Sequence, residues 1–275
     1  MKLLNNISLE KYNDVDWILN WLKENPIIGN ENLNPIEYFH CFWKGQLSDL
    51  HLLCLQSLVK THPDSKIIMW TPNLFELSGS NSFIKIKKSL KNNIEFNEVD
   101  KNLFNNADAE YFYSKYLLLC NQLNQSSLAY ASDIIRFVIL QVYGGVWFDL
   151  DVLFLRNLND IKIKRYVSQW GTDKCGNAAI MRLEKSHNLL KQIYKKFEQP
   201  CYPTTTFKLE NDLDITIIPS TFFDILWRPL NQIPNYLQFK SLDDFFEIQD
   251  LKLPNEIFAY HWHNRWNKTF KFKLF

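Results

Sequence analysis

The chain has 275 residues and a mass of 32.8 kDa, with 46% hydrophobic and 22% charged residues. This composition is typical of a soluble globular protein and excludes a disordered or collagen-like chain. The 31 lysines and arginines nearly balance the 30 aspartates and glutamates, so no overall basic charge points to nucleic acid or to an anionic membrane.

The five cysteines are scattered and form no C-x-x-C pair, a pattern typical of buried thiols in a reducing compartment. The first residues include Asn, Glu and Lys before any long apolar stretch, so no signal peptide is predicted. The longest apolar stretch, residues 137–148, is interrupted by Gln141 and two glycines and is too short to span a bilayer. We therefore expect a cytoplasmic protein without a transmembrane segment.

The first segment of the chain has the apolar spacing of one helix face. The residues that carry this spacing are Val15, Ile18, Leu19 and Leu22. A run rich in Asn, Gly and Pro at residues 30–35 then indicates a connection. The predicted organisation is a helical extension over residues 1–37, followed by a main domain over residues 38–275.

From residue 38 on, short β-prone runs alternate with helical patterns. Strands are predicted at residues 38–43, 66–70, 94–99, 146–148, 166–169, 178–181, 215–218 and 257–261. Helices are predicted at residues 47–60, with Ser48 as a possible N-cap, and at 111–123, 132–142 and 186–197. This alternation predicts an α/β domain with a mostly parallel sheet. Ligands of such sheets bind at the carboxyl ends of the strands, near a topological switch point.

The most informative stretch begins at Ser132. We expect Ser132 to cap a helix and Asp133 to lie in its first turn, where negative charge is favoured. Arg136 shares a helix face with Asp133 because the two residues are three positions apart. The rest of this helix is apolar, and buried charges need partners. The pair is therefore either an internal salt bridge or part of a functional site.

The same stretch ends in a D-x-D motif. Gly144-Gly145 is predicted to end the helix in a left-handed turn. The following strand leads to Asp149 and Asp151, which we expect to point to the same side of an extended backbone. Two carboxylates at a strand end form an oxygen-rich site that suits a hard divalent cation and phosphate oxygens. Hydrophobic residues on both sides of the motif argue against a solvated loop.

A second group of polar residues lies near the last residues of the sequence. His261 and His263 alternate as on a strand, and Asn264 adds a carbonyl ligand. A His-x-His pair near a terminus is more often structural than metal-binding, and no C-x-x-C or H-E-x-x-H motif indicates zinc. The sequence has neither a G-x-S-x-G nucleophile elbow nor a Walker A loop, so it lacks the motifs of the corresponding hydrolases and NTPases.

The array S-D-x-x-R, followed by Y-G-G-V-W-F-D-L-D, resembles the D-x-D region of retaining glycosyltransferases with the GT-A fold. The chain is most similar to the family of yeast-type initiating mannosyltransferases and capsular-polysaccharide sugar transferases, and more distantly to the glucosylating domains of clostridial toxins. Further similar segments are Phe42-Trp43-Lys44-Gly45, residues 57–70, residues 176–180 and His261-Trp262-x-x-x-Trp266. The resemblance covers residues 38–266. It implies a GT-A fold, which is a Rossmann-like, mostly parallel central sheet with flanking helices, after the N-terminal helical extension.

The resemblance also implies roles for the matching residues near the D-x-D motif. Trp43 would stack on the nucleotide base. Asp133 and Arg136 would hold donor sugar hydroxyls and the region near the leaving group. Asp149 would contact the ribose or the sugar, and Asp151 would bind Mn²⁺ or Mg²⁺.

Further implied roles fall on later residues. Asn177 would lie near the reacting sugar, and Trp266 would pack on the diphosphate. His261 and Asn264 would complete the cation site, with His263 as the less favoured ligand. The sequence departs from the family at two places, because the family usually has Tyr where Trp147 or Phe148 stands, and a small polar residue where Arg265 stands. Arg265 can contact phosphate directly, which leaves the choice between the two histidines open.

The predicted function is a metal-dependent retaining hexosyltransferase of glycan or polysaccharide biosynthesis. It would move a hexose or N-acetylhexosamine from a nucleotide sugar to a glycan or protein acceptor. A UDP-sugar is favoured over a GDP-sugar because Trp43 suits a pyrimidine. The family implies front-side attack, with the departing phosphate oxygen helping to deprotonate the acceptor. Two alternatives remain. One is a HAD-type phosphatase, because its nucleophile motif resembles Asp149-Leu150-Asp151-Val152. The other is a nucleotide-sugar-binding module without turnover.

Overall fold

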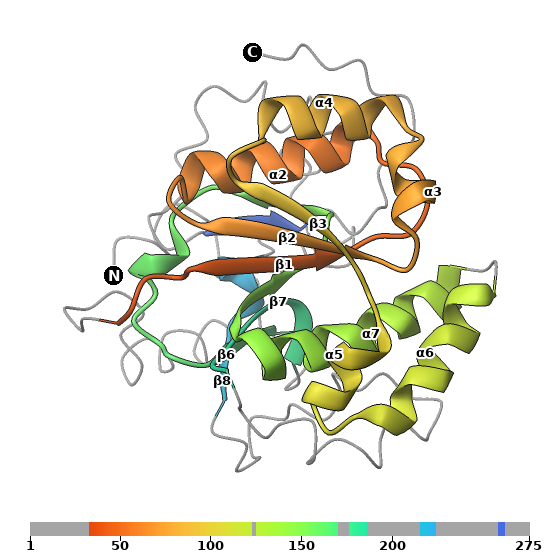
Figure 1. Cartoon of the computed structure of the whole chain (residues 1–275). Coiled ribbons are helices and arrows are strands. Elements are labelled where there is room, and N and C mark those ends of the chain that lie inside the picture. Colours follow the sequence, from red (N-terminus) through yellow and green to blue (C-terminus); the bar gives the residue numbers. More distant parts are fainter. Residues whose placement is uncertain (1–32, 123–124, 170–175, 186–214, 224–257, 262–275) are drawn as a thin grey trace, which may run out of the picture.

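A seven-stranded sheet organises the part of the chain that the computed structural model describes, which is residues 33–122, 125–169, 176–185, 215–223 and 258–261. The strand order is β3-β2-β1-β4-β7-β6-β8 (Figure 1). The strands are β1 (Tyr38–Phe42), β2 (Lys66–Thr71), β3 (Ile94–Glu98), β4 (Gly145–Phe148), β6 (Tyr166–Gln169), β7 (Gly176–Leu183) and β8 (Thr216–Ile218). All neighbouring strands pair in parallel except that β7 runs antiparallel to both β4 and β6. The sheet is therefore mostly parallel, as predicted.

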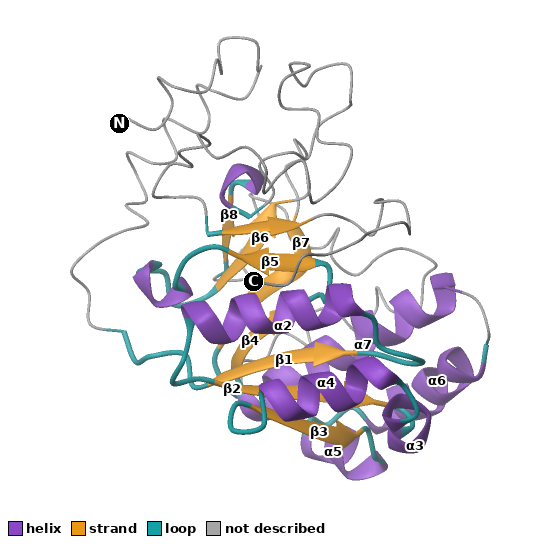
Figure 2. Cartoon of the chain, turned by 90° about the horizontal axis from the view of Figure 1, so that it is seen from above, coloured by secondary structure: helices purple, strands orange, loops and turns teal. Residues whose placement is uncertain are grey.

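Helices cover both faces of this sheet (Figure 1). One face carries α2 (Asp49–Thr61) and α4 (Asn81–Ser89), which lie in front of the sheet in Figure 2. The other face carries α5 (Lys101–Asn106), α6 (Glu110–Asn121) and α7 (Gln125–Tyr143). The alternation of side chains along β1 serves both layers, because Phe39 belongs to the apolar core under α2 and Phe42 to the core under α7. This is the architecture expected of the GT-A fold, so the predicted fold class is confirmed.

A second, two-stranded sheet joins distant parts of the sequence. Strand β5 (Val152–Phe154) pairs antiparallel with β9 (Ala259–His261), and Val152 lies opposite His261. The Ser57 hydroxyl of α2 accepts a hydrogen bond of 2.9 Å from the Phe154 N–H. Strand β5 follows the D-x-D motif directly, so this small sheet brings the later histidine to the motif.

The predicted strands of the large sheet, and the helices at α2 and α6, are confirmed to within a few residues. Of the expected helical extension over residues 1–37, residues 1–32 lie outside the described part of the chain and residues 33–37 form no helix. The expected helix at 186–197 also lies outside the described residues. Three short helices were not predicted: α3 (Leu74–Ser78), α4 and α5. Their N-caps are present in the sequence, because the side chains of Asn73, Ser80 and Asp100 each accept a backbone N–H three residues later.

The expected start of α7 is wrong. The helix begins at Gln125, so Ser132 lies inside it rather than at its N-cap, and Asp133 is not in its first turn. The Ser132 hydroxyl accepts a hydrogen bond of 3.1 Å from Arg136 Nη2 instead. Serine is typical of N-caps, but inside a helix its hydroxyl can instead bond to another group of the same helix, and the sequence alone does not separate the two cases.

The predicted left-handed turn between α7 and β4 is confirmed. Gly144 and Gly145 have φ values of +71° and +93°, and the Gly144 N–H donates to the Leu140 carbonyl at 2.9 Å. A Cβ atom at Gly145 would collide with the carbonyl oxygen of Tyr38 on β1. The turn therefore needs glycine for its backbone conformation and for the close approach of two strands.

We expect Gly145→Ala to lower the free energy of unfolding by about 3 kcal/mol, since it combines a strained backbone with a collision against backbone atoms. Gly79→Ala is the matched control: Gly79 is exposed, has φ −71°, and its added Cβ would lie 3.6 Å from the nearest atom. That variant should stay within about 0.5 kcal/mol of the parent chain. Urea titrations of the three proteins measure both values, and equal losses for the two variants would contradict the expectation.

Two further features concern the expected compartment. The thiols of Cys41, Cys54 and Cys120 are buried and free, while Cys175 and Cys201 lie outside the described residues. Within the described ranges, no helix has the length and apolar character needed to cross a bilayer.

Candidate active site

The candidate site lies at the point in the sheet where the order in which the strands are added reverses. Strands β2 and β3 follow on one side of β1, and β4 returns on its other side, so β1 and β4 flank a topological switch point. Trp43 follows β1 and Asp149 follows β4, and these parallel strands end at the same edge. Asn177 reaches that edge too, because it lies at the start of the antiparallel strand β7.

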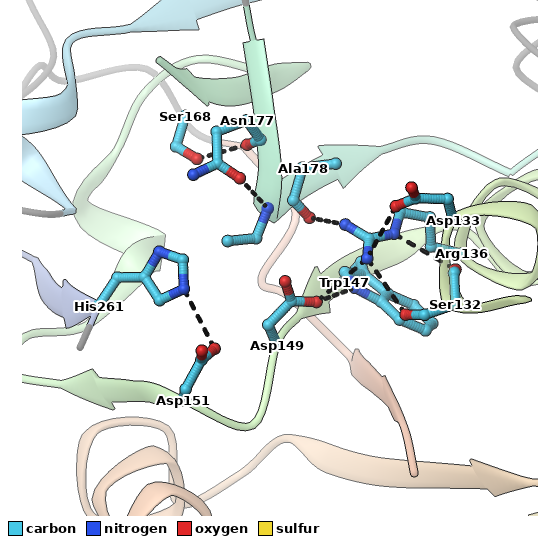
Figure 3. A network of polar contacts seen from close by, with 11 residues as sticks. Ser132, Asp133, Arg136, Trp147, Asp149, Asp151, Ser168, Asn177, Ala178 and His261 are labelled. Atoms are coloured by element: carbon cyan, nitrogen blue, oxygen red, sulfur yellow. Dashed lines mark hydrogen bonds and ion pairs between the residues drawn. The ribbon is translucent and has the colours of Figure 1, made fainter. Parts of the chain in front are cut away.

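Arg136 is the centre of a buried polar network (Figure 3). Its Nη2 lies 3.1 Å from Asp133 Oδ1 and 3.3 Å from Asp149 Oδ1. Its Nη1 donates to the Ala178 carbonyl at 2.8 Å, and its guanidinium carbon lies 5.2 Å from the ring centroid of Trp147. The internal salt bridge with Asp133 thus exists, but it extends to the D-x-D motif. Asp133 and Arg136 are 6% and 5% exposed, so the charged groups of both are buried within this network.

Asp149 is held at one oxygen and open at the other. Its Oδ1 accepts a hydrogen bond of 2.9 Å from Trp147 Nε1 in addition to the contact with Arg136. The side chain remains 31% exposed. This anchoring leaves Oδ2 available to a ligand at the strand edge, and Figure 3 shows Asp149 between Arg136 and the other two members of an acidic cluster.

That cluster consists of Asp149, Asp151 and His261, whose ligand atoms all lie within 4.8 Å of one another. His261 Nε2 lies 3.1 Å from Asp151 Oδ1 (Figure 3). The expectation that the two aspartates alternate on an extended backbone is wrong, because β4 ends at Phe148 and the motif forms a turn before β5. The two carboxylates converge in a turn and not through the period of a strand.

The two aspartates differ in their electrostatic surroundings. Burial raises the pKa of Asp149, against the attraction of Arg136, and the neighbouring Asp151 raises it further. Burial also opposes ionisation of Asp151, but His261 outweighs it and lowers the pKa of that carboxyl. Asp151 is therefore the more readily ionised of the two.

The donor set fits a divalent cation. Two carboxylates and one imidazole are hard and borderline ligands, which Mn²⁺ accepts together. The unequal pKa values leave Asp151 ionised, as a metal ligand must be. The cluster therefore suits the cation expected from the sequence.

The other predicted site residues have different outcomes. Trp43 is half-buried at the strand edge. The Asn177 side-chain oxygen accepts from the Ala179 N–H at 3.0 Å, and Asn177 lines a small crevice that also includes Ser168, Gln169, Ser220, Phe223 and His261. Four predicted site residues lie outside the described part of the chain: His263, Asn264, Arg265 and Trp266.

His51 is a neighbour of the site that was not predicted, although Ser48-x-x-His51 at a helix start is a capping pattern.

Asp133 gives the fold a defined pH dependence. Burial raises its pKa to about 6, with Arg136 opposing the shift and Asp149 adding to it. The folded chain binds the Asp133 proton more tightly than the unfolded chain does. The contribution of this proton to the free energy of unfolding therefore grows as pH falls from 7 to 5 and is lost as pH rises through about 6. We expect the parent chain to gain about 1 kcal/mol from it between pH 7 and pH 5, and Asp133→Asn to lack this gain.

Urea titrations of the parent chain and of Asp133→Asn at both pH values measure this difference, since other titrating groups are shared by the two proteins. The same pH response in both proteins would contradict the assignment.

A comparison with protein families agrees with this geometry. Residues 48–168 match the family described as "Glycosyltransferase sugar-binding region containing DXD motif". The match covers a little under half of the chain and includes helix α2, Asp133, Arg136 and the D-x-D turn. It confirms the resemblance to DXD-containing glycosyltransferases for this region.

Several known proteins are similar to the chain. An uncharacterized protein of Arabidopsis thaliana, At4g19900, is 24% identical over 238 residues, which cover 78% of this chain and 36% of that protein. The chain thus spans about a third of the length of this relative.

Among solved structures, the PaToxG glycosyltransferase has 16% identity and a TM-score of 0.48, covering 72% of this chain and 75% of that one. The UDP-bound glycosyltransferase domain of the YGT toxin has 13% identity and a TM-score of 0.41, covering 60% and 62%. The galactosyltransferase LgtC, in complex with donor and acceptor sugar analogs, has 16% identity and a TM-score of 0.39, covering 67% and 74%.

Proposed function

We propose that this chain, in which residues 48–168 form a DXD-containing glycosyltransferase sugar-binding region, is a metal-dependent retaining hexosyltransferase. It transfers a hexose or N-acetylhexosamine from a nucleotide sugar, with UDP favoured over GDP, to a glycan or protein acceptor. The main domain comprises residues 38–275, after an N-terminal extension of residues 1–37. The observation that carries the proposal is the convergence of Asp149, Asp151 and His261 directly after strand β4.

The metal role is supported by the chemistry of this cluster. Asp151 and His261 would hold Mn²⁺, or Mg²⁺ in its place, with the available Oδ2 of Asp149 beside them. A divalent cation bound there would neutralise charge on the diphosphate as the bond to the sugar breaks. Asn264 remains a proposed additional ligand, with His263 less favoured.

The residues of the chain prepare the donor for transfer. Arg136 and Trp147 fix Asp149 Oδ1, so that Oδ2 is directed to the ribose or the sugar without reorganisation during the reaction. Trp43 stacks on the base, Asn177 lies beside the reacting sugar, and Trp266 packs on the diphosphate. Asp133 and Arg136 are proposed to support the donor through Asp149, and the role expected from the sequence, direct contact with sugar hydroxyls and the region near the leaving group, stays a prediction.

The proposed reaction balances without a further reactant. The bond between the anomeric carbon and the diphosphate oxygen breaks, and a bond to the acceptor hydroxyl oxygen forms on the same face of the sugar. The acceptor proton passes to the departing phosphate oxygen, so the products are the glycoside and the nucleoside diphosphate. The configuration at the anomeric carbon is retained.

The test is nucleotide release from a panel of UDP- and GDP-sugars with Mn²⁺. We expect release from one donor class, loss of release with EDTA, and recovery when Mn²⁺ is restored. NMR of the transferred sugar should show the anomeric configuration of the donor.

Each alternative result has a distinct meaning. Inverted configuration would contradict the retaining mechanism, while EDTA-resistant release would contradict the metal role. Donor binding without release, in the presence of candidate acceptors, would favour a binding module. Phosphate release from a generic phosphomonoester would favour a phosphatase.

A further inference from the structure

The ring of Trp43 has two fixed neighbours at the end of β1. Its Nε1–H donates to the Gln46 carbonyl at 3.1 Å. Its ring centroid lies 4.1 Å from that of His51, with the planes tilted by 58°. One contact fixes the edge of the indole and the other supports its ring. Together they limit the orientations that Trp43 can adopt.

His51 is itself held rigidly. It is the third residue of α2, is 7% exposed, and its Nδ1 accepts the Ser48 N–H at 3.0 Å. An accepting Nδ1 carries no proton, so the neutral ring is protonated at Nε2. Burial lowers the pKa of His51 to about 4, against the attraction of Asp151, so the ring is neutral at physiological pH. The imidazole is therefore locked by the start of its own helix.

The same helix is connected to the D-x-D turn. Asp151 and His51 are close enough for each charge to act on the pKa of the other. Further along α2, Ser57 accepts the N–H of Phe154 on β5, the strand that follows Asp151. One rigid helix thus contacts the half-buried tryptophan at its start and the strand after the acidic cluster further along.

We propose that His51 is a positioning residue for nucleotide binding, because its ring fixes the plane of Trp43 and its helix aligns that plane with the acidic cluster. The inference rests on the proposed function, in which Trp43 stacks on the base. It assigns His51 no contact with the donor.

Two substitutions separate the role of the His51 ring from the role of its Nδ1 atom. His51→Asn keeps a side-chain oxygen near the place of Nδ1, so it can accept the Ser48 N–H, but it removes the ring under Trp43. His51→Phe keeps a ring and removes the acceptor. The first variant should therefore impair nucleotide binding, while the second should mainly lower the melting temperature.

The same helix offers a matched control. His62 follows the last residue of α2, is 2% exposed, and its Nε2 accepts the Leu158 N–H at 2.7 Å. Burial also lowers its pKa to about 4. His62→Asn removes a comparable buried imidazole, but the aromatic rings that His62 contacts are those of Phe39 and Phe154 rather than Trp43.

The first measurement is UDP binding by calorimetry in the presence of Mn²⁺. Stacking of a base on an aromatic ring implies a loss of about tenfold in affinity for Trp43→Ala, and we expect a similar loss for His51→Asn. His51→Phe and His62→Asn should stay within about twofold of the parent chain. If Trp43→Ala weakens binding and His51→Asn does not, or if His51→Phe is as weak as His51→Asn, the proposal is overturned.

A second measurement needs no nucleotide. In protein labelled with 5-fluorotryptophan, the Trp43 resonance is assigned by its loss in Trp43→Phe. We expect that resonance to shift and broaden in His51→Asn and to stay unchanged in His62→Asn. An unchanged Trp43 resonance in His51→Asn overturns the positioning role. A parent chain that binds neither UDP nor GDP, with the expected shift present, would instead contradict the proposed function.

Discussion

Replacing Asp151 with asparagine is expected to reduce donor turnover by about three orders of magnitude, the largest effect on activity that we predict. Asp151 is the more readily ionised carboxylate of the cluster, because His261 lies 3.1 Å from its Oδ1. Asparagine keeps the shape and one oxygen but removes the charge that, in the proposed function, would hold a cation beside a diphosphate. The measurement is nucleotide release at saturating Mn²⁺, with folding checked by circular dichroism.

Asp160→Asn is the matched control, since Asp160 is exposed and follows the same motif on a short 3-10 helix at Leu158–Asp160. It should leave turnover within a factor of two of the parent value. Full activity in Asp151→Asn would show that the cluster does not serve the reaction, whatever its geometry suggests.

Arg136→Met is expected to have the largest effect on stability, a loss of about 3–5 kcal/mol in the free energy of unfolding. The substitution removes the cation that Asp133 and Asp149 share, and leaves the Ala178 carbonyl without this donor. Removing one member of a buried ionic network costs more than the network contributes, because the remaining charges stay buried. Urea unfolding at pH 7 measures the loss.

Two further variants test the cause of this loss. The double variant Arg136→Met with Asp133→Asn should recover part of the stability, because one of the uncompensated carboxylates becomes neutral. Lys164→Met is the surface control: Lys164 Nζ lies 2.7 Å from Glu184 Oε1 and its side chain is 58% exposed, so its loss should stay below about 1 kcal/mol. A loss of this small size in Arg136→Met as well would mean that the network does not anchor the D-x-D turn.

Much of the fold was predictable because its signals are local. The apolar runs of β1, β2 and β4 and the Gly144-Gly145 turn are contiguous in the sequence, and each appears in the structure close to its expected place. The start of α7 was not predictable from Ser132, because its hydroxyl binds a side chain one turn later rather than the helix end.

The candidate site was predictable only in part, because its members come from distant segments. The D-x-D motif indicates an acidic site by itself, although it forms a turn and not the expected extended strand. Which histidine meets Asp151 depends on the pairing of β5 with β9, and spacing alone does not define that register. His51 was missed because its significance comes from the ring of Trp43, which the fold places against it.

The pairing of β5 with β9 also sets a time at which the cluster can form. His261 follows Asp151 by about a hundred residues. At synthesis rates of about 5–20 residues per second, the histidine leaves the ribosome roughly 5–20 s after the aspartate. During that interval the nascent chain carries both carboxylates of the motif but not their imidazole partner. Assembly of the complete cluster is therefore a late event in the life of each new molecule, after the strands of the central sheet have been made.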